Sequence, residues 1–223
     1  MTAGRRVVVT GLGTVNPLGH DVASFWEACL AGRSGVGEIR SFDASSLRTR
    51  IAAEVAGFDP EAHMDRRLAR RLDRFGQFFV VAAGQALADA GLHFGEDDPA
   101  AESAGVAVGS GIGGILTFQG EMDVMRRRGY DRVSPYAIPQ IICNIAAGQV
   151  SIDYHLYGPS LCTVTACAAS ANALGDAAEV IRRGDAEVMV AGGAEAAIGE
   201  FAMAAFGQAR ALSTRNEDPQ RAS

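Results

Sequence analysis

The residues best suited to covalent chemistry lie in one short stretch, TVTACAASANALGDA, at residues 163–177. Cys167 stands where a β-branched run stops and an alanine-rich helical pattern begins. A thiol at such a junction meets the positive end of a helix dipole, which favours thiolate, and free backbone N–H groups that can hold an oxyanion. The pattern indicates a candidate nucleophile. Its alternative is a small apolar core residue, because cysteine is among the most buried residue types.

The other candidate ligands and nucleophiles are isolated in the sequence. Cys29, Cys143 and Cys162 have no C-x-x-C spacing and are interpreted as core residues in a reducing cytoplasm. The four histidines lie far apart, so we expect no local zinc site, no other metal and no cofactor. All 20 basic residues are arginine, which excludes Schiff-base chemistry by lysine within this sequence.

The second candidate motif is the glycine-rich stretch GSGIGG at 109–114. Gly109, Gly111 and Gly114 fit G-x-G-x-x-G after a predicted strand, which is typical of a dinucleotide-binding turn, and Asp131 lies 20 positions after Gly111. That acid follows three arginines and precedes a proline loop, whereas the dinucleotide motif needs it at the end of a second strand. The pattern therefore favours a turn that lets backbone approach a ligand closely, with a nucleotide-binding module as the alternative.

Composition sets the broad class of protein. The 223 residues are 48% apolar and 21% charged, which is typical of a globular protein with a sizeable core. The net charge of −6 argues against nucleic acid as a partner. No apolar run reaches the roughly 18 residues of a membrane span, so we expect no membrane insertion.

The elements that must position these residues alternate along the chain. Asp21 is predicted to cap the first helix and Gly184 to end the last, with Leu174, Ala177 and Ile181 on the apolar face of that last helix. This alternation predicts an α/β layered fold with a mostly parallel sheet. Strands are predicted at 6–13, 103–111, 160–166 and 186–195, helices at 21–32, 65–92, 115–129, 141–158 and 168–184, and a loop at 134–139.

Long stretches of the sequence, in order, closely resemble one enzyme family. They run from VVVTGLGTVNPLG (7–19) through GSGIGG and SPYAIP to TVTACAASANALGDA and FGQARALSTRNEDPQRAS. The family that they resemble is β-ketoacyl-acyl-carrier-protein synthase, type II. The resemblance implies the thiolase-like fold, in which two similar α/β halves pack together, and a homodimer. Residues 1–223 would form the N-terminal half, with a mixed, mostly parallel five-stranded sheet covered by helices.

The resemblance also assigns roles to residues. Cys167 would carry the acyl chain as a thioester, Ile112 would line the acyl tunnel and Phe206 would gate it. Docking of the acidic acyl carrier protein would use arginines near the tunnel mouth. Asp131 stands here where the family has a basic residue, which weakens one corner of this docking surface. The docking arginines implied by the resemblance are Arg67, Arg70, Arg71, Arg132 and Arg210.

The implied reaction is acyl transfer to Cys167 followed by decarboxylative Claisen condensation with malonyl-carrier protein. The family stabilises the enolate with two histidines and a lysine after the cysteine, and these 223 residues have neither a histidine after Cys167 nor any lysine. We expect this polypeptide to lack condensation activity. A type II polyketide ketosynthase remains an alternative, and a non-catalytic chain-length partner is disfavoured because such proteins typically lose the cysteine.

Overall fold

The computed structural model describes residues 5–222. In chain order, the elements are α1 (Val22–Leu30), β1 (Gly37–Glu38), β2 (Ile51–Ala52), α2 (Arg66–Ala69), α3 (Arg74–Asp89), β3 (Ala104–Gly109), α4 (Ile115–Arg128), α5 (Ala137–Ile141), α6 (Ile145–Asp153), β4 (Ser160–Thr163), α7 (Ala169–Arg183), β5 (Val188–Gly193) and α8 (Glu200–Gln208).

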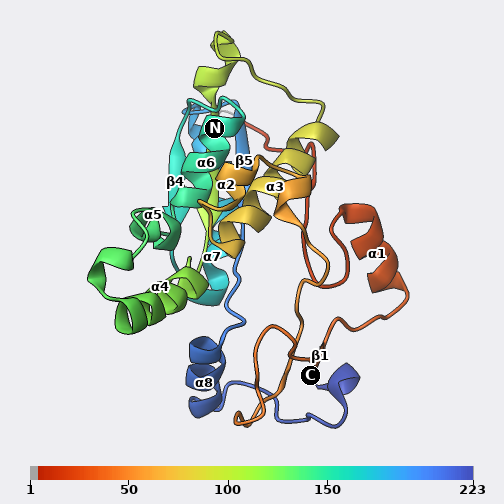
Figure 1. Ribbon diagram of the computed structural model, residues 1–223. Coiled ribbons are helices and arrows are strands. Elements are labelled where there is room, and N and C mark those ends of the chain that lie inside the picture. The colour runs from red at the N-terminus through yellow and green to blue at the C-terminus, as the bar shows by residue number, and fades with distance from the viewer. Residues whose placement is uncertain (1–4, 223) are drawn as a thin grey trace.

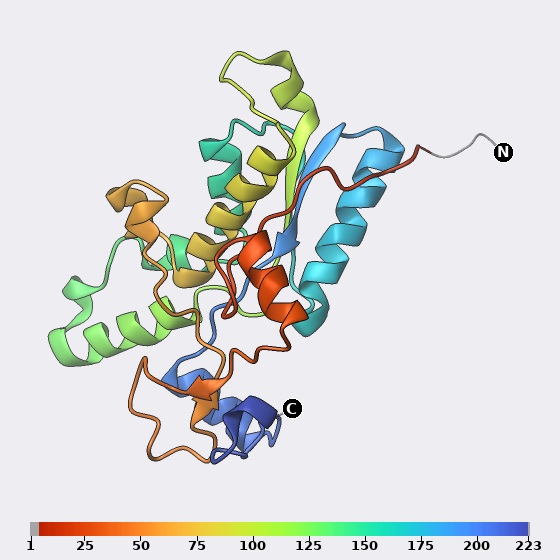
Figure 2. The same cartoon turned by 90° about the vertical axis from the view of Figure 1, so that its right-hand side faces the viewer.

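A parallel sheet with the order β4-β3-β5 lies at the centre of three layers. Helix α7 covers one face, and α3 and α6 cover the other, as the edge-on view in Figure 2 shows. The short antiparallel pair β1-β2 and helix α8 lie apart from this sandwich, at the lower end in Figure 1. Within the described residues, β4 and β5 each pair on one side only, so both edges of the sheet are open.

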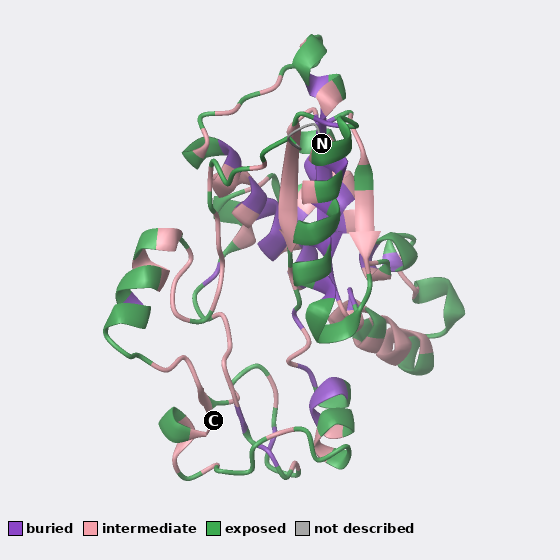
Figure 3. Cartoon of the chain, turned by 180° about the vertical axis from the view of Figure 1, so that it is seen from behind, coloured by how far each residue is buried: buried purple, intermediate pink, exposed green. Residues whose placement is uncertain are grey.

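The central strand β3 separates two chemically different faces. Its side chains alternate, so Val106 and Val108 join the core formed with α3 and α6, whereas Ala107 packs with α7. All six residues of β3 are buried, and buried residues gather around the sheet in Figure 3. The face toward α7 carries only glycine or alanine from β3, namely Gly105, Ala107 and Gly109, so this helix can approach the sheet closely.

Residues 6–13 do not form the predicted strand, and the expected five-stranded sheet has three strands here. Val8 and Val9 are 65% and 79% exposed. The backbone N–H of Leu12 donates to the Asp89 side chain of α3 at 2.9 Å rather than to another strand. A strand needs a ladder partner for its backbone groups, and no strand among the described residues is paired with this segment.

The predicted long helix at 65–92 is two helices, α2 and α3. The break lies at residues 70–73, a few positions before Gly76, the glycine at which the sequence suggests an interruption. Asp73 causes this break because its carboxylate caps α3, accepting a hydrogen bond from the N–H of Phe75 at 3.3 Å. The other carboxylate oxygen accepts from the N–H of Thr117 at 2.8 Å. One buried acid therefore joins the starts of α3 and α4.

Two further predictions need correction. The segment 134–139 contains the start of α5, and Pro139 fits there because the first turn of a helix leaves its N–H groups without intrahelical acceptors. Helix α7 buries Ala169, Ala173, Ala177 and Val180 instead of Leu174, which is 52% exposed. Alanines face the sheet because the small residues of β3 let α7 approach closely, and longer side chains would not fit in the narrow space that remains.

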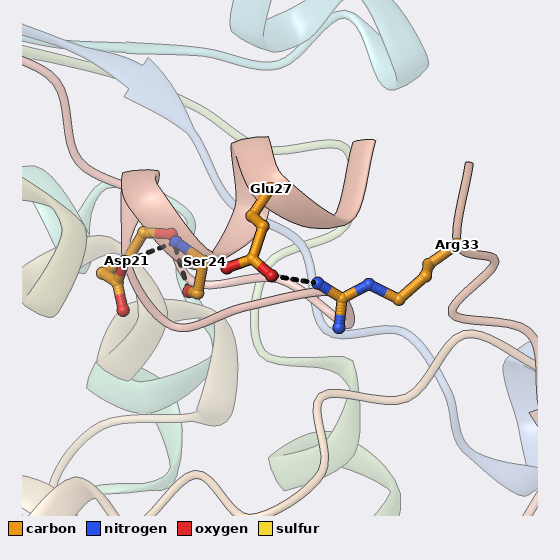
Figure 4. A network of polar contacts seen from close by, with 4 residues as sticks. All are labelled: Asp21, Ser24, Glu27 and Arg33. Carbon is orange, nitrogen blue, oxygen red and sulfur yellow. Dashed lines mark hydrogen bonds and ion pairs between the residues drawn. The ribbon is translucent and has the colours of Figure 1, made fainter. Parts of the chain in front are cut away.

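Local capping signals were predicted correctly. The side chain of Asp21 accepts a hydrogen bond from the N–H of Ser24 at 2.8 Å and so caps α1, and Arg33 pairs with Glu27 at the other end of the helix at 3.5 Å (Figure 4). Gly184 ends α7 with a left-handed backbone, φ 84°. These motifs depend only on residues within a few positions of each other.

The close approach of α7 to the sheet predicts a strong effect of adding one methyl group to Gly109. A Cβ there would lie 2.2 Å from the carbonyl oxygen of Ala169, so Gly109→Ala is expected to lower the free energy of unfolding by about 1–3 kcal/mol. The control is Gly175→Ala, because a Cβ on this α7 glycine meets no atom within 4 Å and should raise helix stability by up to about 1 kcal/mol. Urea denaturation followed by circular dichroism measures both. Equal stability of the two variants would contradict the tight contact.

Candidate active site

Three chain segments leave the sheet side by side at the carboxyl ends of its strands. Gly109 at the end of β3 is in register with Thr163 of β4 and Gly193 of β5. The segments that follow carry the glycine turn, Cys167 and Glu195 respectively. The carboxyl edge of a parallel sheet is the usual place for a binding or catalytic site in layered α/β proteins.

Cys167 lies in a short 3₁₀ turn, Ala166–Ala168, that leads directly into α7. Its thiol is exposed. The first N–H groups of a helix have no intrahelical acceptors, and the 15-residue helix α7 adds its dipole at this end. The structure therefore has the strand-to-helix elbow that the sequence predicts, with an exposed sulfur. The N–H groups of Ala168 and Ala169 already donate within the turn, to the carbonyls of Thr165 and Ala166.

The elbow is strained at the residue before the cysteine. Ala166 has φ 51°, in the left-handed region that costs an L-residue about 1–2 kcal/mol. Such a conformation persists only where surrounding contacts hold it, and it is concentrated at functional sites. The segment after β3 lies beside this residue: a Cβ on Gly111 would lie 3.4 Å from the Cα of Ala166.

The glycine turn Ser110–Gly113 lies against this elbow and is not free to bind phosphate. Its Gly111 and Ile112 N–H groups donate to the carboxylate of Glu195 at 2.7 and 3.0 Å. This internal carboxylate occupies the place that a phosphate would take in a dinucleotide-binding turn. Glu195 was not among the predicted site residues, and the signal for it was its position at the end of the last predicted strand.

The other cysteines have different surroundings. Cys29 is exposed, which corrects its interpretation as a core residue, whereas Cys143 and Cys162 are half-buried. Burial raises the pKa of the Cys143 thiol, and the nearby Glu195 carboxylate raises it further. Burial also raises the pKa of Cys162, with Cys143 as the second cause.

The two tunnel residues are placed differently. Ile112 lies on the glycine turn beside the elbow, and its side chain is partly exposed. Phe206 lies on α8, whose start is tied to α4 by a hydrogen bond from the N–H of Phe201 to the side chain of Gln119 at 3.1 Å. A hollow of about 760 Å³ between α3 and the segments 13–17 and 193–198 is lined by none of Cys167, Ile112 and Phe206.

Most of the candidate docking arginines share one corner of the molecule. The guanidinium of Arg71 lies 4.7 Å from the ring centre of Tyr136 and donates to its hydroxyl at 3.1 Å. The side chain of Gln140 donates to the carbonyl of Arg70 at 2.8 Å. These contacts join α2 to the segment of Arg132 and α5. Arg210 instead follows α8, which lies away from α2 and α5 in Figures 1 and 2.

Between residues 5 and 222, no three His, Cys, Asp or Glu side chains come together in a way that could hold a metal ion. None of the helices described in this range combines the length and the apolar character needed to cross a lipid bilayer.

The layered fold is that of the thiolase-like ketosynthases. A beta-ketoacyl synthase structure from Burkholderia phymatum superposes with a TM-score of 0.83 at 35% identity, covering 96% of this chain and 52% of that one. A type II polyketide ketosynthase in complex with its acyl-carrier protein gives a TM-score of 0.77 at 28% identity, covering 92% of this chain and 55% of that one.

Residues 4–223 match the family model of the beta-ketoacyl synthase N-terminal domain, so the chain belongs to this family. Curated relatives include the 3-oxoacyl-[acyl-carrier-protein] synthase 2 of Coxiella burnetii, 47% identical over 219 residues, and that of Synechocystis, 44% identical over 219 residues. Each alignment covers 98% of this chain and 52% of the relative. The chain thus spans about half the length of the curated relatives that it matches.

The thiols should react in an order set by exposure and pKa. Iodoacetamide at pH 7 is expected to label Cys29 and Cys167 at least about tenfold faster than Cys143 and Cys162. A raised pKa means that the reactive thiolate forms only at higher pH, so labelling of the two half-buried thiols should accelerate above the usual cysteine range. Peptide mass spectrometry at several pH values measures each site. Rapid labelling of Cys143 at pH 7 in the folded protein would contradict this order.

Proposed function

We propose that this chain supplies the acyl-accepting half of a 3-oxoacyl-acyl-carrier-protein synthase of fatty-acid elongation. The observation that carries the proposal is the exposed Cys167 thiol at a strained elbow before α7. Support comes from curated relatives of that name at 43–47% identity. Residues 1–223 are proposed to form one half-domain of the thiolase-like fold, acting in the cytoplasm as part of a homodimer.

The first proposed step is transfer of an acyl group to Cys167. Its thiolate attacks the carbonyl of the thioester on the acyl-carrier protein, and the backbone N–H of Cys167 itself gives one hydrogen bond to the oxyanion that forms. Collapse of the tetrahedral intermediate breaks the bond to the carrier sulfur. The carrier thiolate leaves and takes up the proton that Cys167 released, and the acyl group remains as a thioester on Cys167.

The second proposed step is carbon–carbon bond formation. Malonyl-carrier protein loses CO₂, and the resulting enolate carbon attacks the acyl carbonyl on Cys167. The product is a 3-oxoacyl thioester on the carrier, and Cys167 leaves as a thiolate. Stabilising the enolate needs cationic or hydrogen-bond-donating groups. These 223 residues have no histidine after Cys167 and no lysine, so we assign them the first step alone.

Substrate contacts follow from the same proposal. Ile112 beside the elbow and Phe206 on α8 are proposed to line and gate the acyl tunnel. The acyl carrier protein is proposed to dock on Arg67, Arg70, Arg71, Arg132 and Arg210, all of which are exposed. Positive charge near the tunnel steers an acidic partner even though the chain carries −6 overall. A polyketide ketosynthase is the second candidate, because solved neighbours at 28–29% identity are of that kind.

Acyl transfer should depend on a single thiol. After incubation with an acyl-carrier-protein thioester, wild-type protein and Cys29→Ser are expected to gain one acyl mass, while Cys167→Ser gains none. The 223-residue polypeptide should form no 3-oxoacyl product from malonyl-carrier protein. Intact-mass spectrometry measures the first and a condensation assay the second. Acylation of Cys167→Ser, or rapid condensation by the wild-type polypeptide, would contradict the proposal.

Reversing the α2 charges should weaken carrier binding. The combined change Arg67→Glu, Arg70→Glu and Arg71→Glu is expected to raise the Kd for acyl carrier protein on the order of tenfold at low salt, because each exposed ion pair contributes up to about 1 kcal/mol. Arg182→Glu, at the far end of α7, is the control and should bind like wild type. Titration at several salt concentrations tests the electrostatic origin, and an unchanged Kd would disprove this docking surface.

A further inference from the structure

A carboxylate of the chain is built into the turn beside Cys167. Oε2 of Glu195 accepts hydrogen bonds from the N–H groups of Gly111 and Ile112, and Oε1 accepts one from the Ser110 hydroxyl at 3.5 Å. The Ser110 oxygen in turn accepts from the N–H of Gly113 at 3.1 Å. The Glu195 side chain therefore binds the N–H groups of Gly111 and Ile112 directly, and it holds that of Gly113 through the Ser110 hydroxyl.

The turn lies close to its neighbouring segments. A Cβ on Gly111 would lie 2.9 Å from Oε2 of Glu195 and 3.4 Å from the Cα of Ala166. A Cβ on Gly113 would lie 2.8 Å from the sulfur of Cys143. Gly111 thus lies beside both the Glu195 carboxylate and the strained residue before Cys167.

The left-handed backbone of Ala166 needs surrounding contacts to hold it in place. Ala166 keeps its positive φ only because neighbouring groups exclude other conformations. Gly111 of the turn lies beside Ala166, and hydrogen bonds from Gly111 and Ile112 to Glu195 hold the turn, so the segments that follow the three strands are connected. None of the described hydrogen bonds joins the Glu195 carboxylate to Cys167. Any effect of Glu195 on the thiol must therefore pass through the turn.

We propose that Glu195 is a positioning residue for Cys167, holding the Ser110–Gly113 turn against Ala166 so that the thiol keeps the orientation needed for acyl transfer. This inference rests on the proposed function. Nothing in the proposed chemistry requires the negative charge itself. A neutral side chain of the same length and with the same oxygen acceptor should therefore replace it, whereas a shorter carboxylate should not reach both N–H groups.

Three variants separate geometry from charge. Glu195→Gln keeps the length and an acceptor oxygen, Glu195→Asp keeps the charge but is one methylene shorter, and Glu195→Ala keeps neither. Glu187→Ala is the matched control, because it removes an exposed carboxylate just before β5, at the opposite end of the same strand. Slow iodoacetamide labelling of Cys162, whose pKa is raised mainly by burial, serves as the check that each variant is folded.

The rate of Cys167 acylation by octanoyl-coenzyme A is measured by mass spectrometry. We expect Glu195→Gln and the control to stay within about threefold of wild type, and the Asp and Ala variants to fall about 10- to 100-fold, since small misplacements near reacting groups have effects of this size. Wild-type rates in folded Asp or Ala variants would overturn the inference. A loss in Glu195→Gln with a normal rate in Glu195→Asp would overturn it as well, because the charge would then matter.

Hydrogen–deuterium exchange tests the positioning role of Glu195 without an acyl donor. The amides of residues 111–113 and of the Ala166–Ala168 turn should both exchange faster in the Asp and Ala variants, and both should stay protected in Glu195→Gln. Unchanged exchange at Ala166–Ala168 when the glycine turn loosens would overturn the positioning role. Failure of wild-type Cys167 to accept any acyl group would instead overturn the proposed function, and the exchange result would still decide the role of Glu195.

Discussion

The close contact between the sheet and the first turn of α7 is the constraint on which the candidate site depends. Gly109 and Gly193 end two neighbouring strands, and a methyl group on either would collide with Ala169 or Ser170. Without side chains at these two positions, α7 can begin directly over the strand ends. Cys167 is consequently presented at the carboxyl edge of the sheet, and the alanines of α7 rather than its longer apolar residues face the strands.

Each of the three strands contributes a different kind of group to this edge. Strand β3 leads into a turn rich in backbone N–H donors, β4 into the thiol of Cys167, and β5 into the carboxylate of Glu195. The turn resembles a phosphate-binding motif in sequence, yet its donors are already bound to Glu195. A glycine motif thus predicts the backbone geometry of a turn, whereas the group that binds its N–H donors depends on the residues that follow the neighbouring strands.

Features determined by nearby residues could be predicted from the sequence. The Asp21 cap, the Gly184 terminus and the elbow before α7 all depend on short local patterns. The state of residues 6–13 could not, because a strand exists only when another strand pairs with it. Glu195 was missed for a similar reason: it is 84 residues away from Gly111, and only the parallel register of β3 and β5 brings the two together.

The open edges of the sheet have a consequence for assembly. Among the described strands, β4 and β5 each leave one row of backbone N–H and C=O groups without a strand partner, and the two rows differ. Joining β4 to β4 of a second copy would close a two-fold particle, whereas joining β4 of one copy to β5 of the next would give a ring or an open filament. A segment paired with the β5 edge would block this head-to-tail joining and leave only the two-fold arrangement at β4.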